Sequence, residues 1–330
     1  MLDISTIDPR REARERVAGR FEVRVLEPSP PADTDPAWFA DDPVAVDRIP
    51  PGATALTPMP STGITWDALA RHEPELAAWC ADRWLGAWRA VAPVDDIDAF
   101  TATRRSWHAL AEHVLAPARH RANGKIGLRY ARAGFGTPFF GADEQVRVAG
   151  SSLVVIREGG ASVHPITTVG AAAQVVGIAP GAPTGVYTPT TRLEPDVDLA
   201  VDDASARLLG DWFGFACSVL EVLRAGARPD DDPARVQLWP EHFDLSVDLG
   251  DDASGMRATY GASPGDDAHP EPYLYVTPWT AQPANELWND TTFSGASLPL
   301  SSLDVGLEQR ALALAFFARP YSRLHDDQRP

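Results

Sequence analysis

An imidazole and a carboxylate lie two residues apart in the segment LWPEHFDLSVDLG, which spans residues 238–250. Such a pair can hydrogen-bond, orient a general base or supply two ligands to a metal ion. If the segment is one strand, its period of two places an apolar set of side chains on one face and a polar set on the other. The apolar set is Phe243, Leu245, Val247 and Leu249, and the polar set is His242, Asp244, Ser246 and Asp248.

The apolar face of this strand is expected to enter the core, which leaves His242 and Asp244 as the centre of a candidate site. An alternative stays open, in which the polar face is a solvated outer surface without a function. Trp239 and Pro240, just before the pair, favour the site, because a bulky aromatic residue at the start of a strand shields part of that surface.

A second segment, YGASPGDDAHPEPYLYV, combines a turn-rich connection with a strand whose Tyr273 and Tyr275 share a face. If the two segments form neighbouring strands, the connection overhangs the polar side of the first strand. The candidate catalytic group is then His242, Asp244, Asp266 and His269, and the expected substrate-binding residues are Trp239, Glu241, Tyr273, Tyr275 and Trp279.

Acid–base catalysis by His242 and Asp244 is the simplest mechanism for such a group. A metal-dependent enzyme is an alternative, because His242, Asp244 and His269 form a set of two histidines and a carboxylate that suits zinc or iron. Their spacing matches no known metal motif, and Ser-Pro-Gly-Asp is also typical of an ordinary turn. The cofactor therefore stays open.

Common catalytic and nucleotide-binding motifs are missing from the sequence. It has no G-x-S-x-G elbow and no H-E-x-x-H helix, and GFGTPFFG at 134–141 lacks the glycine spacing of a phosphate-binding loop. Three other histidines, His108, His113 and His164, are expected to be packing or surface residues.

Hydrophobic periodicity predicts an α+β protein with antiparallel sheets packed against helices. The expected helices span 66–91, 97–121, 203–225 and 304–318, the last broken or kinked before Pro320. Short alternating runs at 124–165 and 236–278 leave no room for the crossovers of a parallel sheet. The order of helix, strands and short helix occurs at 97–178 and again at 203–320, which suggests a weak duplication, although a single mixed domain is favoured.

The N-terminal part differs from the rest in composition. A strand is predicted at Phe21–Leu26, and closely spaced prolines from Pro28 to Pro60 predict an arm without regular structure, anchored by Trp38 and Phe39. We therefore divide the chain into 1–60, the N-terminal strand and proline-rich arm, and 61–330, a mixed α+β domain with an N-terminal helical flank. An arm of this length suits a non-catalytic association module, which is an alternative function.

Composition restricts the partners. The chain of 330 residues has 29 basic and 46 acidic residues, a formal charge of −17 that repels nucleic acids and anionic membranes. No segment has the length and apolarity of a membrane span or a signal-peptide core, so we expect a cytoplasmic protein. Its oligomeric state stays open.

Several segments together resemble an uncharacterised protein family found mainly in actinobacteria. They are GFGTPFFG, LWPEHFDLSVDLG, YGASPGDDAHPEPYLYVTPW and LALAFFARPYSRL, within residues 120–320. The resemblance implies the extent of the domain and no mechanism. From the residues themselves we expect an enzyme or small-molecule-binding protein with an aromatic-lined pocket and a polar cluster of histidine and aspartate.

Overall fold

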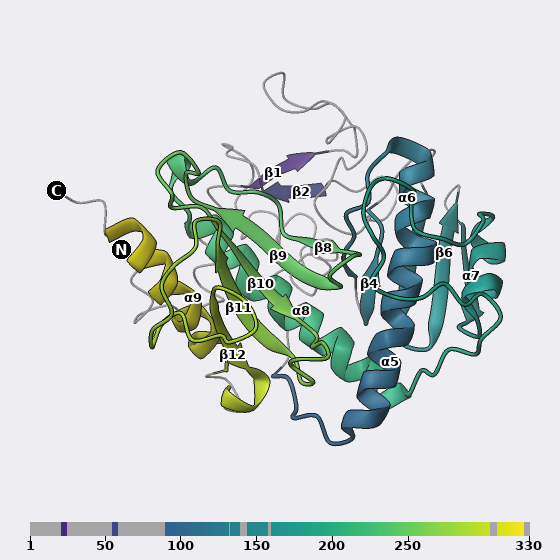
Figure 1. The fold of residues 1–330 in the computed structure, drawn as a ribbon. Helices are drawn as coiled ribbons and strands as arrows, with labels where there is room; N and C mark the ends of the chain where they lie inside the picture. Colours follow the sequence, from purple (N-terminus) through teal and green to yellow (C-terminus); the bar gives the residue numbers. More distant parts are fainter. Residues whose placement is uncertain are drawn as a thin grey trace, which may run out of the picture.

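A computed structural model describes residues 21–24, 55–58, 90–131, 133–138, 144–157, 160–303 and 309–326. These residues form an α+β fold in which two antiparallel sheets of five strands each pack against helices (Figure 1). The predicted fold class is therefore confirmed. Within the described residues, no helix is both long enough and apolar enough to cross a membrane.

The first sheet is a meander in which each strand pairs with the next along the chain. Runs rich in β-branched residues, such as SLVVIR, favour strands with one buried face. Gly150 has a φ of +58° and makes one of the tight turns. The strands are β3 (Arg129–Ala131), β4 (Gly134–Gly136), β5 (Gln145–Ala149), β6 (Ser152–Arg157) and β7 (Gly160–Pro165).

The second sheet is also a meander and meets the first at one edge. Its strands are β8 (Gln237–Trp239), β9 (Asp244–Leu249), β10 (Ala258–Ser263), β11 (Tyr273–Pro278) and β12 (Ala296–Pro299), in the order β12-β11-β10-β9-β8. Leu128, just before β3, and Leu238 in β8 exchange two backbone hydrogen bonds, of 2.7 and 2.9 Å. This bridge couples two edges whose backbone groups need partners.

The helices are α5 (Ile97–Leu110), the π-helical turn η2 (Ala111–Leu115), α6 (Ala116–Asn123), α7 (Val169–Val176), α8 (Asp203–Gly226) and α9 (Gln309–Asp326), with 3-10 turns at η3 (Pro229–Asp231) and η4 (Leu300–Ser302). Side-chain caps fix where several of them begin. Asp96 accepts two backbone hydrogen bonds at the start of α5, and Thr168 and Asp202 cap α7 and α8.

Helix α8 packs against strands of both sheets and contributes much of the core. Gly210 lets its backbone approach the β3–β4 turn, because a Cβ there would lie 2.8 Å from the backbone of Ala133. Trp212 and Phe213 in the next turn are completely buried. Burial of each such side chain stabilises the fold by roughly 1.5–3 kcal/mol.

Among the described residues, helices α8 and α9 cover one face of the second sheet. Helix α8 packs against β9 and β10, and α9 packs against β11. The covered face is apolar and buried, with Leu245, Val247, Tyr260, Ala262, Leu274 and Val276. The alternate residues point to the opposite face, which is largely polar and holds Asp244, Ser246, Asp248, Thr259, Ser263, Tyr273, Tyr275 and Thr277.

The structure confirms the helices predicted at 97–121 and 203–225 and corrects the last one. Helix α9 begins at Gln309 and continues to Asp326, so the break expected before Pro320 is wrong. The helix persists because Tyr321 and His325, beyond the proline, are both bound to Asp231. Residues 66–89 of the first predicted helix lie outside the described residues.

The predicted N-terminal strand is confirmed as β1 (Phe21–Arg24), which pairs antiparallel with β2 (Ala55–Pro58). Strand β2 corrects the expectation that the whole of 28–60 lacks regular structure. Its proline stands at the strand end, where the missing N–H is tolerated. The rest of the arm, with Trp38 and Phe39, lies outside the described residues, and the weak duplication stays a prediction.

A buried cluster fastens the C-terminal helix to η3. The carboxylate of Asp231 accepts hydrogen bonds from the Tyr321 hydroxyl, from the Arg228 N–H at 2.6 Å and from Nε2 of His325 at 2.8 Å. The other ring nitrogen of His325 faces the Tyr321 carbonyl oxygen at 2.7 Å. Both nitrogens of the buried ring thus face acceptors.

We expect His325→Ala to lower the free energy of unfolding by about 3–5 kcal/mol, because it leaves the buried Asp231 carboxylate without one of its partners. Urea denaturation measures the loss. His164→Ala is the matched control, since that ring bonds the exposed Ser162 hydroxyl, and it should cost less than about 1 kcal/mol. Equal losses in the two variants would show that the cluster is unimportant for stability.

Candidate functional site

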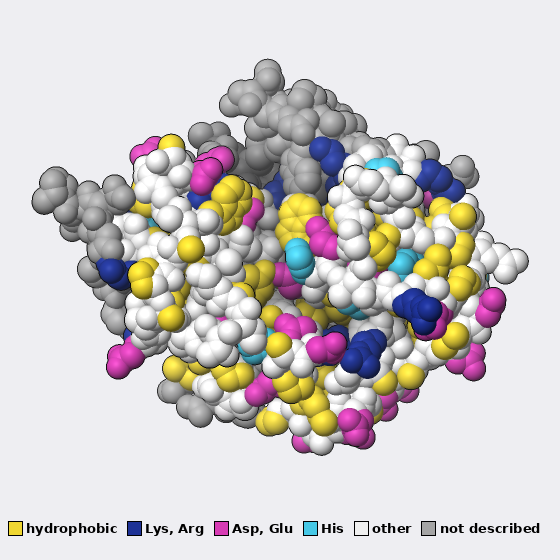
Figure 2. Space-filling view, viewed as in Figure 1, with side chains coloured by type: hydrophobic (Ala, Val, Ile, Leu, Met, Phe, Trp, Pro, Cys, Tyr) yellow, Lys and Arg dark blue, Asp and Glu magenta, His cyan; other side chains and the backbone are white. Residues whose placement is uncertain are grey.

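The polar face of the second sheet is the floor of a cleft of about 1270 Å³. Its walls come from α5, from the segment 190–199, from the β8–β9 hairpin and from the segment 265–268. Figure 2 shows a hollow near the centre of this view, where hydrophobic, acidic and histidine side chains gather. The cleft therefore lies between the second sheet, which comes late in the chain, and α5 and the segment 190–199, which come earlier.

The segment LWPEHFD is a hairpin and not the start of one continuous strand, so the strand predicted through His242 is wrong. Trp239 at the end of β8 pairs with Asp244 at the start of β9, and the Phe243 N–H bonds the Trp239 carbonyl oxygen at 2.7 Å. Pro240 cannot donate to a strand ladder, and the chain reverses just after it. His242 consequently lies exposed in the turn, while Asp244 is 3% exposed.

Phe243 fixes this turn in place. Its φ of +53° is unfavourable for a residue with a Cβ, so the surroundings must hold it. Its ring stacks on His108 of α5, with centroids 5.1 Å apart, and meets Phe135 of β4 and Phe213 of α8 edge-on at 5.1 and 5.4 Å. These contacts position the next residue, Asp244.

His108 adds a polar link between α5 and the same turn. Burial lowers the pKa of His108 to about 4, although Glu112, 3.7 Å away, acts in the opposite direction. The ring is therefore neutral at physiological pH, and its Nε2–H donates to the Pro240 carbonyl oxygen at 2.9 Å. A packing role was predicted for His108, and the ring also lines the cleft.

Asp244 is the most unusual group of the cleft. One carboxylate oxygen accepts a hydrogen bond from the Tyr275 hydroxyl, while the other, Oδ1, is buried without a hydrogen-bond partner. Burial raises the pKa of Asp244 to about 6; the Tyr275 hydrogen bond and His242 oppose this rise, and Glu241 adds to it. The carboxyl group can therefore take up and release a proton near neutral pH.

Gly261 makes the contact between Tyr275 and Asp244 possible. It is the cross-strand neighbour of Tyr275 on one side and of Ser246 on the other. A Cβ at this position would clash with the Tyr275 ring. The ring therefore lies across β10 and reaches the carboxylate on β9. Burial is the main cause that raises the pKa of Tyr275, and the negative charge of Asp244 adds to it.

Asp266 forms a second polar group farther along the cleft. Its carboxylate accepts hydrogen bonds from the Tyr273 hydroxyl at 2.8 Å and from the N–H groups of Ala268 and His269 at 2.7 Å. Burial alone would raise the pKa of Asp266, but these hydrogen bonds outweigh it and lower the pKa. Asp266 is thus an ionised carboxylate that shapes its own loop.

His269 does not line the cleft. Its ring lies behind Asp266, with Nε2 3.0 Å from Asp290 and Nδ1 3.4 Å from Asp266, and it packs on Tyr273 with centroids 4.4 Å apart. This arrangement favours a positioning role over the predicted catalytic one. In the described part of the chain, no three His, Cys, Asp or Glu side chains are grouped so that they could hold a metal ion.

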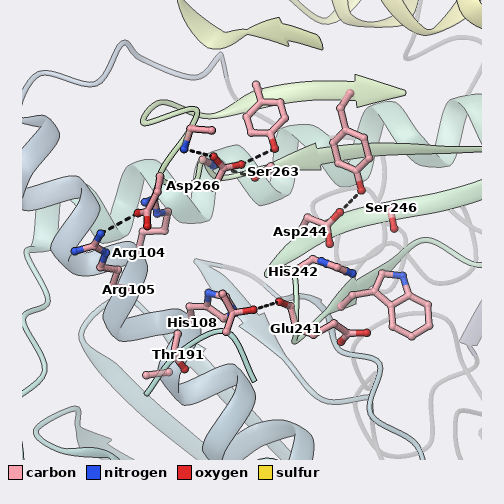
Figure 3. A pocket seen from close by; sticks show the side chains of 18 of the residues that line it. Arg104, Arg105, His108, Thr191, Glu241, His242, Asp244, Ser246, Ser263 and Asp266 are labelled. Atoms are coloured by element: carbon pink, nitrogen blue, oxygen red, sulfur yellow. Dashed lines mark hydrogen bonds and ion pairs between the residues drawn. The ribbon is translucent and has the colours of Figure 1, made fainter. Parts of the chain in front are cut away.

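The other predicted site residues line the cleft, namely His242, Asp244, Asp266, Trp239, Glu241, Tyr273, Tyr275 and Trp279. Sequence reasoning missed the wall contributed by α5. Figure 3 shows Arg104 and Arg105 on the side opposite Glu241, His242 and Asp244. Arg104 lies 3.4 Å from the Pro270 carbonyl oxygen, and Arg105 forms an ion pair with Asp267 at 2.9 Å.

A π-helical turn holds the remaining wall. Glu112 in η2 is fully buried, and its carboxylate accepts hydrogen bonds from the N–H groups of Thr190 and Thr191, both at 2.7 Å. The Thr190 hydroxyl in turn bonds the Glu241 carbonyl oxygen at 2.7 Å. Single π-helical turns often occur at functional sites, and this one fastens the segment 190–199 over the cleft.

Comparisons with protein-family models, with curated proteins and with solved structures give no match. The resemblance of the quoted segments to an actinobacterial family stays a prediction. The fold and the site define an α+β protein with a buried carboxylate among the residues that line a cleft.

We expect Asp244→Asn to change the pH dependence of stability. The pKa of Asp244 is about 6 in the fold and near its ordinary 3.8 in the unfolded chain. The folded state therefore holds the proton more tightly, and this stabilisation is lost as the pH rises from about 4 to about 6. The variant should gain about 3 kcal/mol relative to wild type between pH 4 and pH 7.5.

Urea denaturation of both proteins across this pH range measures the difference. Asp267→Asn removes a carboxylate that is 86% exposed and should leave the wild-type pH dependence unchanged. Parallel curves for wild type and Asp244→Asn would show that Asp244 ionises at an ordinary pH.

Proposed function

We propose that the protein is an enzyme that binds a small polar molecule in the cleft and transfers a proton to or from it through Asp244. One observation carries this proposal: Asp244, among the residues that line the cleft, is 97% buried, has its pKa raised to about 6 and has one buried carboxylate oxygen without a hydrogen-bond partner. General acid–base catalysis works best when the pKa of the group lies near the working pH.

The surroundings of Asp244 support the same role. The Tyr275 hydroxyl holds one carboxylate oxygen, so the geometry of the free oxygen is fixed. The cleft is large enough for a metabolite, since typical ligand sites occupy about 300–1,000 Å³. Trp239, Tyr275 and Trp279 supply apolar surface, and His242 lines the cleft as an exposed residue.

The net charge of −17 supports a small-molecule partner over a nucleic acid. The cytoplasmic location expected from the sequence remains part of the proposal.

The test compares wild type with Asp244→Asn in a metabolite mixture. Ligand-observed NMR identifies compounds that the wild-type protein binds, and the same spectra followed over time identify any compound that it converts. We expect Asp244→Asn to lower turnover at least about 100-fold while the fold is kept. Asp252→Asn, the same carboxylate-to-amide change at an exposed residue that does not line the cleft, should retain wild-type turnover.

A second variant tests whether Asp244 is the acid–base group. Tyr275→Phe removes a hydrogen bond that lowers the pKa of Asp244, so this pKa should rise. If Asp244 is the acid–base group, the pH–rate profile moves in the same direction. A pH–rate profile that is the same in Tyr275→Phe and wild type would contradict the proposal, and so would equal turnover in Asp244→Asn and wild type.

A further inference from the structure

Two buried carboxylate oxygens of the cleft lack a donor. They are Oδ1 of Asp244 and Oε2 of Glu241, and they belong to the same hairpin turn. Asp244 is 97% buried and Glu241 is half-buried, so water reaches these oxygens poorly. A buried acceptor without a donor is costly, which indicates that a bound group satisfies both.

Among the described residues, three arginines line the cleft. Arg104 and Arg105 stand on the opposite wall, where they contact Pro270 and Asp267 (Figure 3). Arg192, in the segment 190–199, is exposed. The turn thus carries two carboxylates, those of Glu241 and Asp244, while Arg104 and Arg105 lie on the opposite wall. This arrangement favours a ligand that carries a positive charge.

Aromatic surface beside the carboxylates suits the same kind of ligand. Trp239 is the cross-strand partner of Asp244, and Tyr275 covers its other side. Faces of tryptophan and tyrosine attract cations, and the cleft already shows one case, in which the guanidinium of Arg257 lies 4.9 Å from the centroid of Trp279.

We infer that the ligand carries a cationic nitrogen group, an ammonium, amidinium or guanidinium, which donates to Asp244 Oδ1 and Glu241 Oε2 against the face of Trp239. This inference rests on the proposed binding function and narrows its substrate to amines, amidines and guanidines. Such a group supplies several N–H donors at once, whereas a carboxylate or phosphate ligand supplies none and would meet two negative charges.

The matched probes are benzamidine, benzamide and benzoate, which share a ring and differ in charge. Isothermal titration calorimetry measures their binding to the full chain. We expect benzamidine to bind at least about tenfold more tightly than the other two. Agmatine, whose charged groups sit on a flexible chain, covers a geometry that a rigid ring does not reach.

The pH dependence of binding identifies the carboxylate. The titratable groups that act on Asp244 are His242 and Glu241 of its own turn and Tyr275 and Tyr273 of β11, while β10 presents the uncharged Gly261 and Ser263. A cation binds the ionised carboxylate, so its affinity should rise about tenfold from pH 5 to pH 7. Asp244→Asn should weaken benzamidine binding about tenfold or more at pH 7 and remove this rise, whereas Asp252→Asn, at an exposed carboxylate that does not line the cleft, should change neither.

Either of two results would overturn the inference that the ligand is a cation. If benzamide or benzoate binds as tightly as benzamidine in a way that depends on Asp244, the ligand is not a cation, yet the proposed function stands. If neither benzamidine nor agmatine binds in a way that depends on Asp244, the cationic class is wrong, and the metabolite screen decides the proposed function by itself.

Discussion

The packing of Phe243 between α5, β4 and α8 is the contact on which the arrangement of the site depends. The ring touches His108, Phe135 and Phe213, which come from both halves of the described chain. Because the backbone of Phe243 is in the left-handed region, the turn keeps its shape only while these contacts persist. The residue that follows is the buried Asp244, so core packing directly determines where the reactive carboxylate lies.

Burying that carboxylate opposes folding, and the structure limits this cost in a particular way. Tyr275 satisfies one oxygen only, so the group is neither fully solvated nor fully paired. A fully bonded carboxylate, such as Asp266, has a lowered pKa and serves as a structural anchor. The contrast between two aspartates on one cleft shows how hydrogen bonding divides similar residues between structural and chemical roles.

Much of the fold and part of the site could be predicted from the sequence, because alternation holds within each strand. It placed Tyr273 and Tyr275 on one face and put Leu245 and Val247 in the core. It failed at Pro240–Phe243, where a tight turn forms without the Asn or Gly that usually marks one. The contribution of Arg104 and His108 could not be predicted, because these residues reach the cleft from a helix far earlier in the chain, and only tertiary packing brings them there. The same holds for His269, whose distance from the cleft depends on its partner Asp290.

Three departures from local preference lie around the same cleft, and each has a tertiary cause. Phe243 keeps a left-handed backbone because aromatic contacts hold it. Gly261 lies in a strand without a side chain, and the Tyr275 ring occupies the space that a Cβ would need. The π-helical turn η2 interrupts an α-helix at Glu112, whose carboxylate binds the segment 190–199. Each departure lowers local stability, so the packing around it must compensate. All three act on groups that line or adjoin the cleft, although a positive φ also occurs at Ala133 and Asp232, and Pro320 lies inside α9. Around the cleft, the contacts that stabilise these departures are also the contacts that set the positions of Asp244 and Tyr275.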